Sequence, residues 1–249
     1  MNAGVAVIDQ SSSGGSELDV RRVRECLAAT GQVYVRRVPP AFDHLAQLSR
    51  LGQVVPQFDG RIVRDVTPDP AADETVHLPA NTRELLAHTE WFEFPGPPPR
   101  YQALWCVRQA TGPGGETTLA DGYAFVAGLP SDQVKRLAER EYTWRPTAVL
   151  ARAGVAYECR HPLVEHRPEA LVVRVPCDER CVDYDDLMAD YIAQARRFFA
   201  GHRLAVKIEE GAVLIWDNWR MMHARTGFTD RRRHLRRLLV SAPTHDEPA

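Results

Sequence analysis

The sequence predicts a mainly β protein, an antiparallel sandwich or barrel with helices packed against its outside. Stretches rich in β-branched and aromatic residues, separated by turn residues, dominate the second half of the chain. Strands and helices do not alternate regularly, so a doubly wound parallel sheet is not expected. The length of 249 residues suits one domain, because single sandwiches and barrels commonly reach roughly 200–250 residues.

The predicted domain begins with two helices on either side of a strand. Ser16 is positioned to cap a helix whose apolar residues fall on one face, and Gly31 is positioned to end it. The apolar run that starts at Gln32 predicts a strand, and a second, shorter helix is expected over residues 41–51.

The later elements are expected to be mostly strands. They are predicted over residues 101–107, 170–175, 204–208, 212–216 and 235–241. Two helices interrupt this series. One runs from Ser131, its expected cap, to about residue 140, and the other covers residues 184–200 with an apolar stripe along one side.

The single domain is expected to span residues 16–242, with a flexible segment at each end. Residues 1–15 include most of a Ser/Gly-rich stretch, and residues 243–249 are polar and contain proline. No Pro/Gly/Ser-rich linker divides the middle of the chain, so a second domain is not predicted.

Charge and cysteine content exclude several classes of function. The 31 basic and 33 acidic side chains leave a formal charge of -2, so no global field favours nucleic acid or an anionic membrane. No apolar run approaches the roughly 18 residues that a transmembrane helix needs, and the N-terminus lacks the features of a signal peptide. The five cysteines form no CxxC pair, which suits reduced thiols. We expect a cytoplasmic protein whose oligomeric state the sequence does not indicate.

His88 and Glu90 form an HxE motif with the spacing of a metal chelate. In an extended strand, residues two apart point to the same face with Cα atoms about 6.6 Å apart. An imidazole nitrogen and a carboxylate oxygen at that spacing suit a divalent transition metal. The motif alone is weak evidence, because two polar residues on the wet face of a strand would give the same pattern.

A second group of polar residues lies near the C-terminus. An apolar strand over residues 211–216 is followed by a turn and then by His223. Arg233 comes ten residues later, and strand alternation places it on the same face as Arg237. The rest of the arginine run before this strand reads as solvated surface.

Together with a segment that contains Thr117, these motifs resemble those of the iron(II)/2-oxoglutarate oxygenases of the taurine dioxygenase and clavaminate synthase type. That family pairs an HxD or HxE motif with a distant histidine in a G-x-V/L-x-I/V-x-D-N-x-R…H-x-R block. The chain carries HTE, WDNWRMMHAR and RHLRR in this order. Its GGET is similar to the family's GG(D/E)T element, and the matching motifs span roughly residues 80–240.

The resemblance implies a double-stranded β-helix, a jelly-roll barrel, that binds Fe(II) through His88, Glu90 and His223. Two histidines and one carboxylate on one face of an octahedral ion leave three positions open, enough for 2-oxoglutarate and O2. Arg233 is expected to pair with the distal carboxylate of 2-oxoglutarate through its planar fork, and Thr117 to add a hydroxyl donor. Halogenating relatives replace the carboxylate ligand by a small residue, so halogenation is not expected here.

The substrate side of the expected site rests on three residues. Arg237 either contacts an anionic group of the primary substrate, as the matching arginine does in some relatives, or supports Arg233. Trp91 and Phe92 begin an aromatic and proline-rich segment after the metal motif and are expected to line or cover the pocket.

The reaction implied by the resemblance is oxidation of a C–H bond, coupled to decarboxylation of 2-oxoglutarate to succinate and CO2. Hydroxylation of a small amino-acid-like or carboxylate-bearing molecule is the default outcome; desaturation, ring formation and isonitrile formation are alternatives. A role in specialised metabolism, with the substrate free or bound to a carrier protein, is a further expectation. Two other classes stay open: a cupin-like metal enzyme that does not use 2-oxoglutarate, and a binding module.

Overall fold

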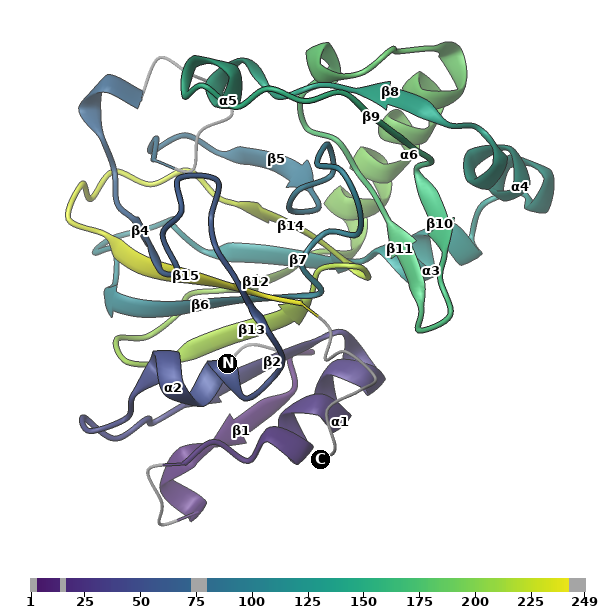
Figure 1. Ribbon diagram of the computed structural model, residues 1–249. Helices are drawn as coiled ribbons and strands as arrows, with labels where there is room; N and C mark the ends of the chain where they lie inside the picture. Colours follow the sequence, from purple (N-terminus) through teal and green to yellow (C-terminus); the bar gives the residue numbers. More distant parts are fainter. Residues whose placement is uncertain (1–3, 14–16, 73–79, 242–249) are drawn as a thin grey trace.

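The computed structural model describes residues 4–13, 17–72 and 80–241, in which two β-sheets face one another and helices cover their outer sides (Figure 1). The larger, 7-stranded sheet has the order β1-β2-β13-β6-β15-β3, and β4 also pairs with β15. Its neighbouring strands are antiparallel except for β1 and β2. Its strands are β1 (Val7–Asp9), β2 (Gln32–Arg36), β3 (Val54–Val55), β4 (Arg64–Val66), β6 (Tyr101–Arg108), β13 (Val213–Asp217) and β15 (His234–Val240).

The smaller, 4-stranded sheet is antiparallel and has the order β12-β7-β14-β5. Two ribbons, β8-β9 and β10-β11, complete the strands, which are β5 (Leu85–His88), β7 (Thr117–Asp121), β8 (Tyr142–Trp144), β9 (Cys159–His161), β10 (Val164–His166), β11 (Leu171–Val173), β12 (Leu204–Val206) and β14 (Met221–Arg225). The α-helices are α1 (Val20–Thr30), α2 (His44–Ser49), α3 (Gly122–Ala127), α4 (Ser131–Glu139), α5 (Ala148–Arg152) and α6 (Asp186–His202).

The central strands of the larger sheet are buried on both faces, which explains their uninterrupted apolar sequences. Along β13, Ile215 packs in a cluster with α1 and α2, whereas Trp216 belongs to the cluster between the sheets. The neighbouring strand β6 repeats this alternation with Trp105 and Leu104. A third cluster packs α6 and the ribbons against the outer side of the smaller sheet. The facing sheets with external helices confirm the predicted mainly β, jelly-roll class.

One cavity opens at an end of the space between the sheets. Strands β5, β7 and β14 line it from the smaller sheet, and β4, β6 and β15 line it from the larger one. Helix α5 also lines the cavity, and so does the loop that follows β5. The sheets therefore bring strands from distant parts of the sequence to a single site.

The N-terminal segment differs from the expectation. Residues 1–15 were expected to be flexible, yet Val7–Asp9 forms β1 beside β2, and Ile8 is buried. Asp9 pairs with Arg36 and Arg37, which attaches the segment to the sheet. The prediction of a flexible segment is therefore wrong for these residues, because the apolar residues before the Ser/Gly-rich stretch pair with β2 as an edge strand.

Most predicted helices and strands form, with ends shifted by a few residues. Helix α1 begins after Asp19, whose side chain accepts a hydrogen bond from the backbone N–H of Arg22. The expected cap Ser16 and the expected flexible tail 243–249 lie outside the described residues. Ser131 is the first residue of α4 rather than its cap. Helices α3 and α5 were not predicted, because each is shorter than two helical turns and carries little periodic signal.

Candidate active site

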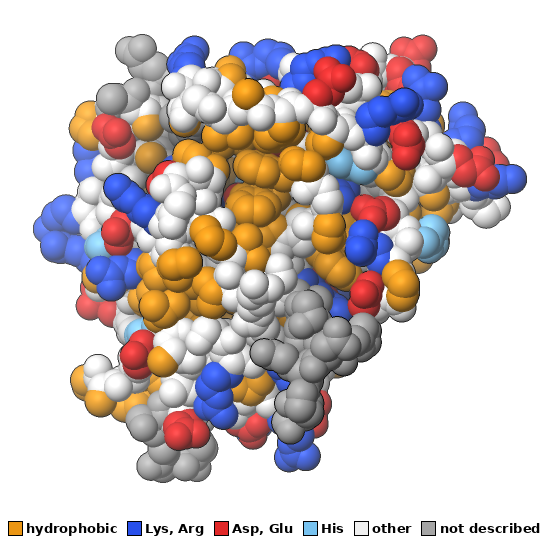
Figure 2. Space-filling model, in the orientation of Figure 1, with side chains coloured by type: hydrophobic (Ala, Val, Ile, Leu, Met, Phe, Trp, Pro, Cys, Tyr) orange, Lys and Arg blue, Asp and Glu red, His pale blue; other side chains and the backbone are white. Residues whose placement is uncertain are grey.

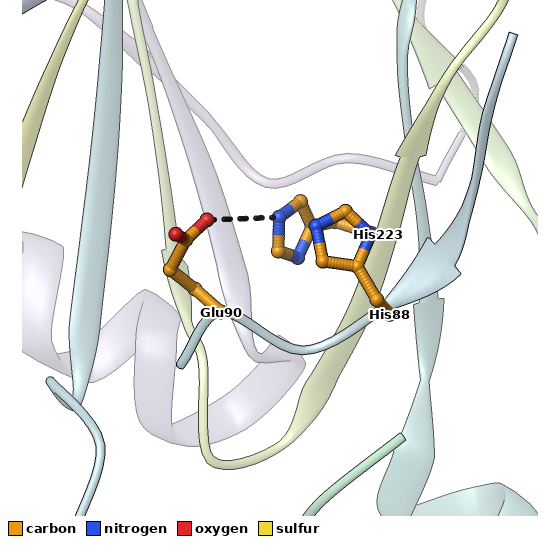
Figure 3. Close-up of side chains that lie close together, drawn as sticks. All are labelled: His88, Glu90 and His223. Atoms are coloured by element: carbon orange, nitrogen blue, oxygen red, sulfur yellow. Dashed lines mark ion pairs between the residues drawn. The ribbon is translucent and has the colours of Figure 1, made fainter. Parts of the chain in front are cut away.

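The two histidines predicted to bind metal lie on neighbouring strands. His88 ends β5 and His223 lies in β14, where the two residues are directly opposite in register. Their ring centroids are 4.2 Å apart. One ligand atom of each histidine and one carboxylate oxygen of Glu90 lie within 4.8 Å of one another (Figure 3). The structure thus brings all three predicted metal ligands to one point.

Hydrogen bonding and burial leave one ring nitrogen of His88 able to bind a metal ion. Nδ1 of His88 lies 2.8 Å from the carbonyl oxygen of Leu86, so Nδ1 carries the proton and Nε2 is left as an acceptor. Burial, aided by the neighbouring His223, lowers the pKa of His88 to about 3, so this ring is neutral at pH 7. Nδ1 of His223 is buried and has no hydrogen-bond partner among the described residues. Two imidazoles beside a carboxylate fit a divalent transition metal such as Fe(II).

Glu90 is held in its ionised form by Arg237. Nη1 of Arg237 lies 2.8 Å from Oε2 of Glu90. Gln57 fixes the same guanidinium, accepting hydrogen bonds from its Nη2 at 2.7 Å and its Nε at 3.1 Å. Burial is the largest single influence and would raise the pKa of Glu90, but the Arg237 charge and the contacts with the two histidines together hold this pKa well below its usual range. Arg237 therefore contacts a predicted metal ligand, and none of its hydrogen bonds or ion pairs in the described structure reaches Arg233.

The main chain around Glu90 corrects one expectation, because no extended strand runs through the HxE motif. Strand β5 ends at His88, and Trp91 has a φ of 60°. Tertiary contacts position the motif instead. The backbone N–H of Thr89 donates to the carbonyl of Val175 at 3.1 Å, and the Thr89 hydroxyl accepts from the Val175 N–H at 3.1 Å.

Asn218 lies in the turn predicted after residues 211–216 and connects the two segments that carry the predicted metal ligands. It is fully buried. Its Oδ1 accepts a hydrogen bond from the Glu90 N–H at 2.7 Å, and its Nδ2 donates to the carbonyls of Glu90 and Pro99, each at 3.0 Å. The side chain thus fixes the loop that carries a metal ligand to the turn before β14.

We expect Asn218→Ala to weaken metal binding roughly 10- to 100-fold, the range typical for groups that orient ligands. Unpaired backbone groups should also reduce the free energy of unfolding by about 1–3 kcal/mol. Asn218→Asp keeps the acceptor for the Glu90 N–H but places a carboxylate oxygen against the carbonyls of Glu90 and Pro99, so it should not restore wild-type affinity. Titration with Mn(II) and urea unfolding measure the two effects, and wild-type metal affinity in Asn218→Ala would contradict the orienting role.

Arg233 directly precedes β15 and is 4 % exposed. Its Nη2 donates to the carbonyl of Gly115 at 3.2 Å, and its guanidinium lies 5.1 Å from the ring centroid of Phe228. Burial lowers its pKa to about 10, so it keeps its charge at pH 7. No carboxylate of the described residues forms an ion pair with it, a costly state for a buried cation.

The GGET segment shapes the surroundings of Arg233. Gly115 has a φ of 79°, and a Cβ there would lie 3.3 Å from Nε of Arg233, so glycine allows both the turn and the close approach. Thr117, two residues later, is buried and lines the same cavity from β7. The two residues predicted to bind 2-oxoglutarate therefore share one cavity with the three predicted metal ligands.

The cavity measures about 1130 Å³, counting the space at its open mouth. Figure 2 shows hydrophobic side chains gathered around a hollow near the middle of the face drawn in Figure 1. Trp91 and Phe92 both line the cavity. Trp91 stacks on Phe94 with centroids 4.4 Å apart, whereas Phe92 is 3 % exposed and packs edge-on against Trp144, so Phe92 is mainly a core residue.

Several residues in or beside the cavity carry no signal in the sequence. Arg64 lines the cavity, and Gln57 fixes the guanidinium of the cavity residue Arg237; both lie between α2 and β5, a region without a recognisable motif. Glu93 lies in the segment predicted to line the pocket but was not singled out. It is buried, and desolvation raises its pKa to about 8. Only the contacts made in the fold reveal these three side chains.

Comparison with known proteins places the chain in a family. The model of "Taurine catabolism dioxygenase TauD, TfdA family" matches residues 5–239. Mitochondrial trimethyllysine dioxygenase of Rattus norvegicus is 25% identical over 222 residues, which are 80% of this chain and 49% of that protein. The chain thus spans about half the length of this curated relative.

Solved structures share the fold. Asparagine oxygenase in complex with Fe(II), 3-hydroxyasparagine and succinate has a TM-score of 0.75 at 19% identity, covering 90% of this chain and 78% of its own. The non-heme iron oxygenase OrfP with Fe and alpha-ketoglutaric acid has a TM-score of 0.67 at 20% identity (90% and 79% covered). PvcB from Pseudomonas aeruginosa has a TM-score of 0.68 at 20% identity (95% and 85% covered).

The family model covers nearly the whole chain. The chain therefore belongs to the TauD, TfdA family, as its motifs predict, and so to a family of dioxygenases that use Fe(II), 2-oxoglutarate and O2.

Proposed function

We propose that this protein is an Fe(II)- and 2-oxoglutarate-dependent dioxygenase that oxidises a C–H bond of a small amino-acid-like substrate. The observation that carries the proposal is the convergence of His88, Glu90 and His223 in a cavity that also holds Arg233. A buried guanidinium that forms no ion pair among the described residues requires an anion, and the distal carboxylate of 2-oxoglutarate matches its planar fork.

Each group of residues has one task in this proposal. His88, Glu90 and His223 hold Fe(II) from one side, which leaves coordination positions for 2-oxoglutarate and O2. Arg233 and Thr117 bind and orient the co-substrate. When bound, Fe(II) supplies the redox chemistry that couples conversion of 2-oxoglutarate to succinate and CO2 with oxidation of the substrate. The apolar cavity wall limits the access of water.

The proposed primary substrate is an amino acid or a similar small carboxylate, and hydroxylation is the proposed outcome. Support comes from the relatives: asparagine oxygenase is solved with 3-hydroxyasparagine, and OrfP with (3S)-hydroxy-L-Arg. PvcB is described as an oxygenase from an isonitrile synthetic pathway, so isonitrile formation is kept as an alternative outcome beside desaturation and ring formation. Among the described residues, no helix has the length and hydropathy to cross a bilayer. All five cysteines are free thiols, which supports the proposed cytoplasmic location.

The direct test is succinate formation from 2-oxoglutarate with added Fe(II), first alone and then with each of the common L-amino acids. We expect Fe(II)-dependent succinate, stimulated by a subset of the amino acids, and a product heavier by one oxygen atom in mass spectrometry. A complete lack of Fe(II)-dependent succinate would contradict the proposal. Stimulation with a product lighter by two hydrogen atoms would replace hydroxylation by desaturation or ring formation.

Arg237 is proposed to contact an anionic group of the primary substrate, since it lines the cavity beside Glu90. Arg237→Ala should lower the amount of oxidised product per succinate several-fold, because the target C–H bond is no longer held near the iron. Comparison of succinate and product in the same reaction measures this ratio. A variant with wild-type coupling would show that Arg237 serves Glu90 alone.

A further inference from the structure

Two arginines face each other across neighbouring strands in the cavity wall. Arg64 on β4 and Arg237 on β15 are directly opposite in register, and both side chains line the cavity. Residues opposite each other in an antiparallel pair lie on the same face of the sheet, and like charges there destabilise the pair. Two cations at this position therefore call for a compensating anion.

Arg237 forms a direct ion pair within the protein, whereas Arg64 is affected by the Glu90 and Asp59 charges only without direct contact. Arg237 is bound by Glu90 and Gln57. Among the described residues, no side chain or carbonyl forms a hydrogen bond or an ion pair with the Arg64 guanidinium, which lies 4.7 Å from the ring centroid of Phe58. Arg64 is also partly buried, and desolvation together with the Arg237 charge lowers its pKa. The aromatic ring fixes the guanidinium in the cavity wall without neutralising it.

The anion that would form an ion pair with Arg64 is distinct from the co-substrate carboxylate proposed to bind Arg233. Arg64 is in register with Arg237, four residues along the chain from Arg233. At about 3.3 Å per residue, this separation is roughly 13 Å. The main chain at Arg64 is therefore well separated from the main chain at Arg233, the residue proposed to pair with the distal carboxylate of 2-oxoglutarate. A second anion, from another molecule, would supply the negative charge beside Arg64.

We infer that Arg64, together with Arg237, binds the carboxylate of the primary substrate and so selects small carboxylic acids over their neutral analogues. The inference rests on the proposed function and adds a specificity-determining residue to it. A carboxylate between the two guanidiniums removes the repulsion within the arginine pair and meets the planar donors of Arg64. It also holds the rest of the substrate over the three metal ligands, because Arg237 contacts one of them.

The test measures succinate formation with Fe(II) and 2-oxoglutarate. Each candidate substrate is supplied in two forms that differ only in the carboxylate. The panel holds the common L-amino acids and simple mono- and dicarboxylic acids, each as the free acid and as the carboxamide. For the wild type we expect stimulation by at least one free acid and not by its amide. For Arg64→Ala we expect the KM of that acid to rise roughly ten- to a hundredfold, while the concentration of co-substrate needed for half-saturation changes far less. Arg64→Lys should recover part of the loss.

Arg61→Ala is the matched control, because Arg61 lies on the same segment but is exposed and pairs with Asp59. It should behave like the wild type. Three results would overturn the inference: equal stimulation by an acid and its amide, an unchanged acid KM in a folded Arg64→Ala, or no stimulation by any acid of the panel. A weakened saturation by the co-substrate instead would assign Arg64 to the binding of 2-oxoglutarate and would also overturn it. If wild-type protein forms no Fe(II)-dependent succinate at all, the proposed function itself fails.

Discussion

Replacement of His223 by alanine should reduce Fe(II)-dependent succinate formation by at least about a hundredfold, since groups that merely orient ligands already cost roughly 10- to 100-fold. His223 lies opposite His88 on the neighbouring strands β14 and β5. Among the described residues, no third histidine belongs to this group of possible metal ligands. Loss of one ligand from a three-ligand site removes most of the metal affinity. His88→Ala and Glu90→Ala should have effects of the same size. Titration with Mn(II) separates lost metal binding from lost turnover.

His166→Ala is a suitable control, because this histidine is exposed on β10 and does not line the cavity. It should retain full activity. Glu90→Asp should retain part of the activity, since the shorter carboxylate preserves the charge that Arg237 binds. Full activity in any of the three alanine variants that remains folded, as judged by circular dichroism, would refute the proposed metal centre.

The grouping of His88, Glu90 and His223 could be predicted because candidate metal ligands are marked by residue types at short spacing or in fixed order. The alternation of buried and exposed side chains from Arg233 into β15 could also be predicted. Arg233, Leu235 and Arg237 are buried, whereas Arg236 is exposed. The sequence did not predict the backbone of the HxE motif. A sequence pattern shows that His88 and Glu90 can share a face but not that β5 ends between them, because tertiary contacts decide where the strand ends.

Residues that act through distant partners could not be identified from the sequence. Asn218 reads as a turn residue, and its bonds to Glu90 join positions 128 residues apart. Gln57 and Arg64 lie in a stretch with little helical or strand periodicity, since β3 and β4 are only two and three residues long. Their roles depend on pairing with β15, a contact that local propensity does not encode. The long apolar strands, in contrast, were predictable because burial on both faces leaves an uninterrupted signal.

Replacement of Arg233 by alanine should raise the co-substrate concentration needed for half-maximal turnover roughly ten- to a hundredfold, with a much smaller effect on the primary substrate. A lost charge-assisted contact to a partly buried carboxylate costs about 1.5–3 kcal/mol, which corresponds to this range. Arg233 is buried and forms no ion pair with a carboxylate of the described residues, so the whole interaction is available to the co-substrate. Succinate formation at varied 2-oxoglutarate concentration measures this half-saturation point directly.

The neighbouring residue provides the matched control for this experiment. Arg232 is exposed and pairs with Asp230, so Arg232→Ala removes an equal charge one residue away without reaching the cavity. It should leave 2-oxoglutarate saturation unchanged. Arg233→Lys should recover only part of the loss, because an ammonium group is a point charge and cannot form the two parallel hydrogen bonds of the guanidinium. If Arg233→Ala saturates at the wild-type concentration, the co-substrate carboxylate is bound elsewhere, and Arg64 and Arg237 become the residues to test for that role.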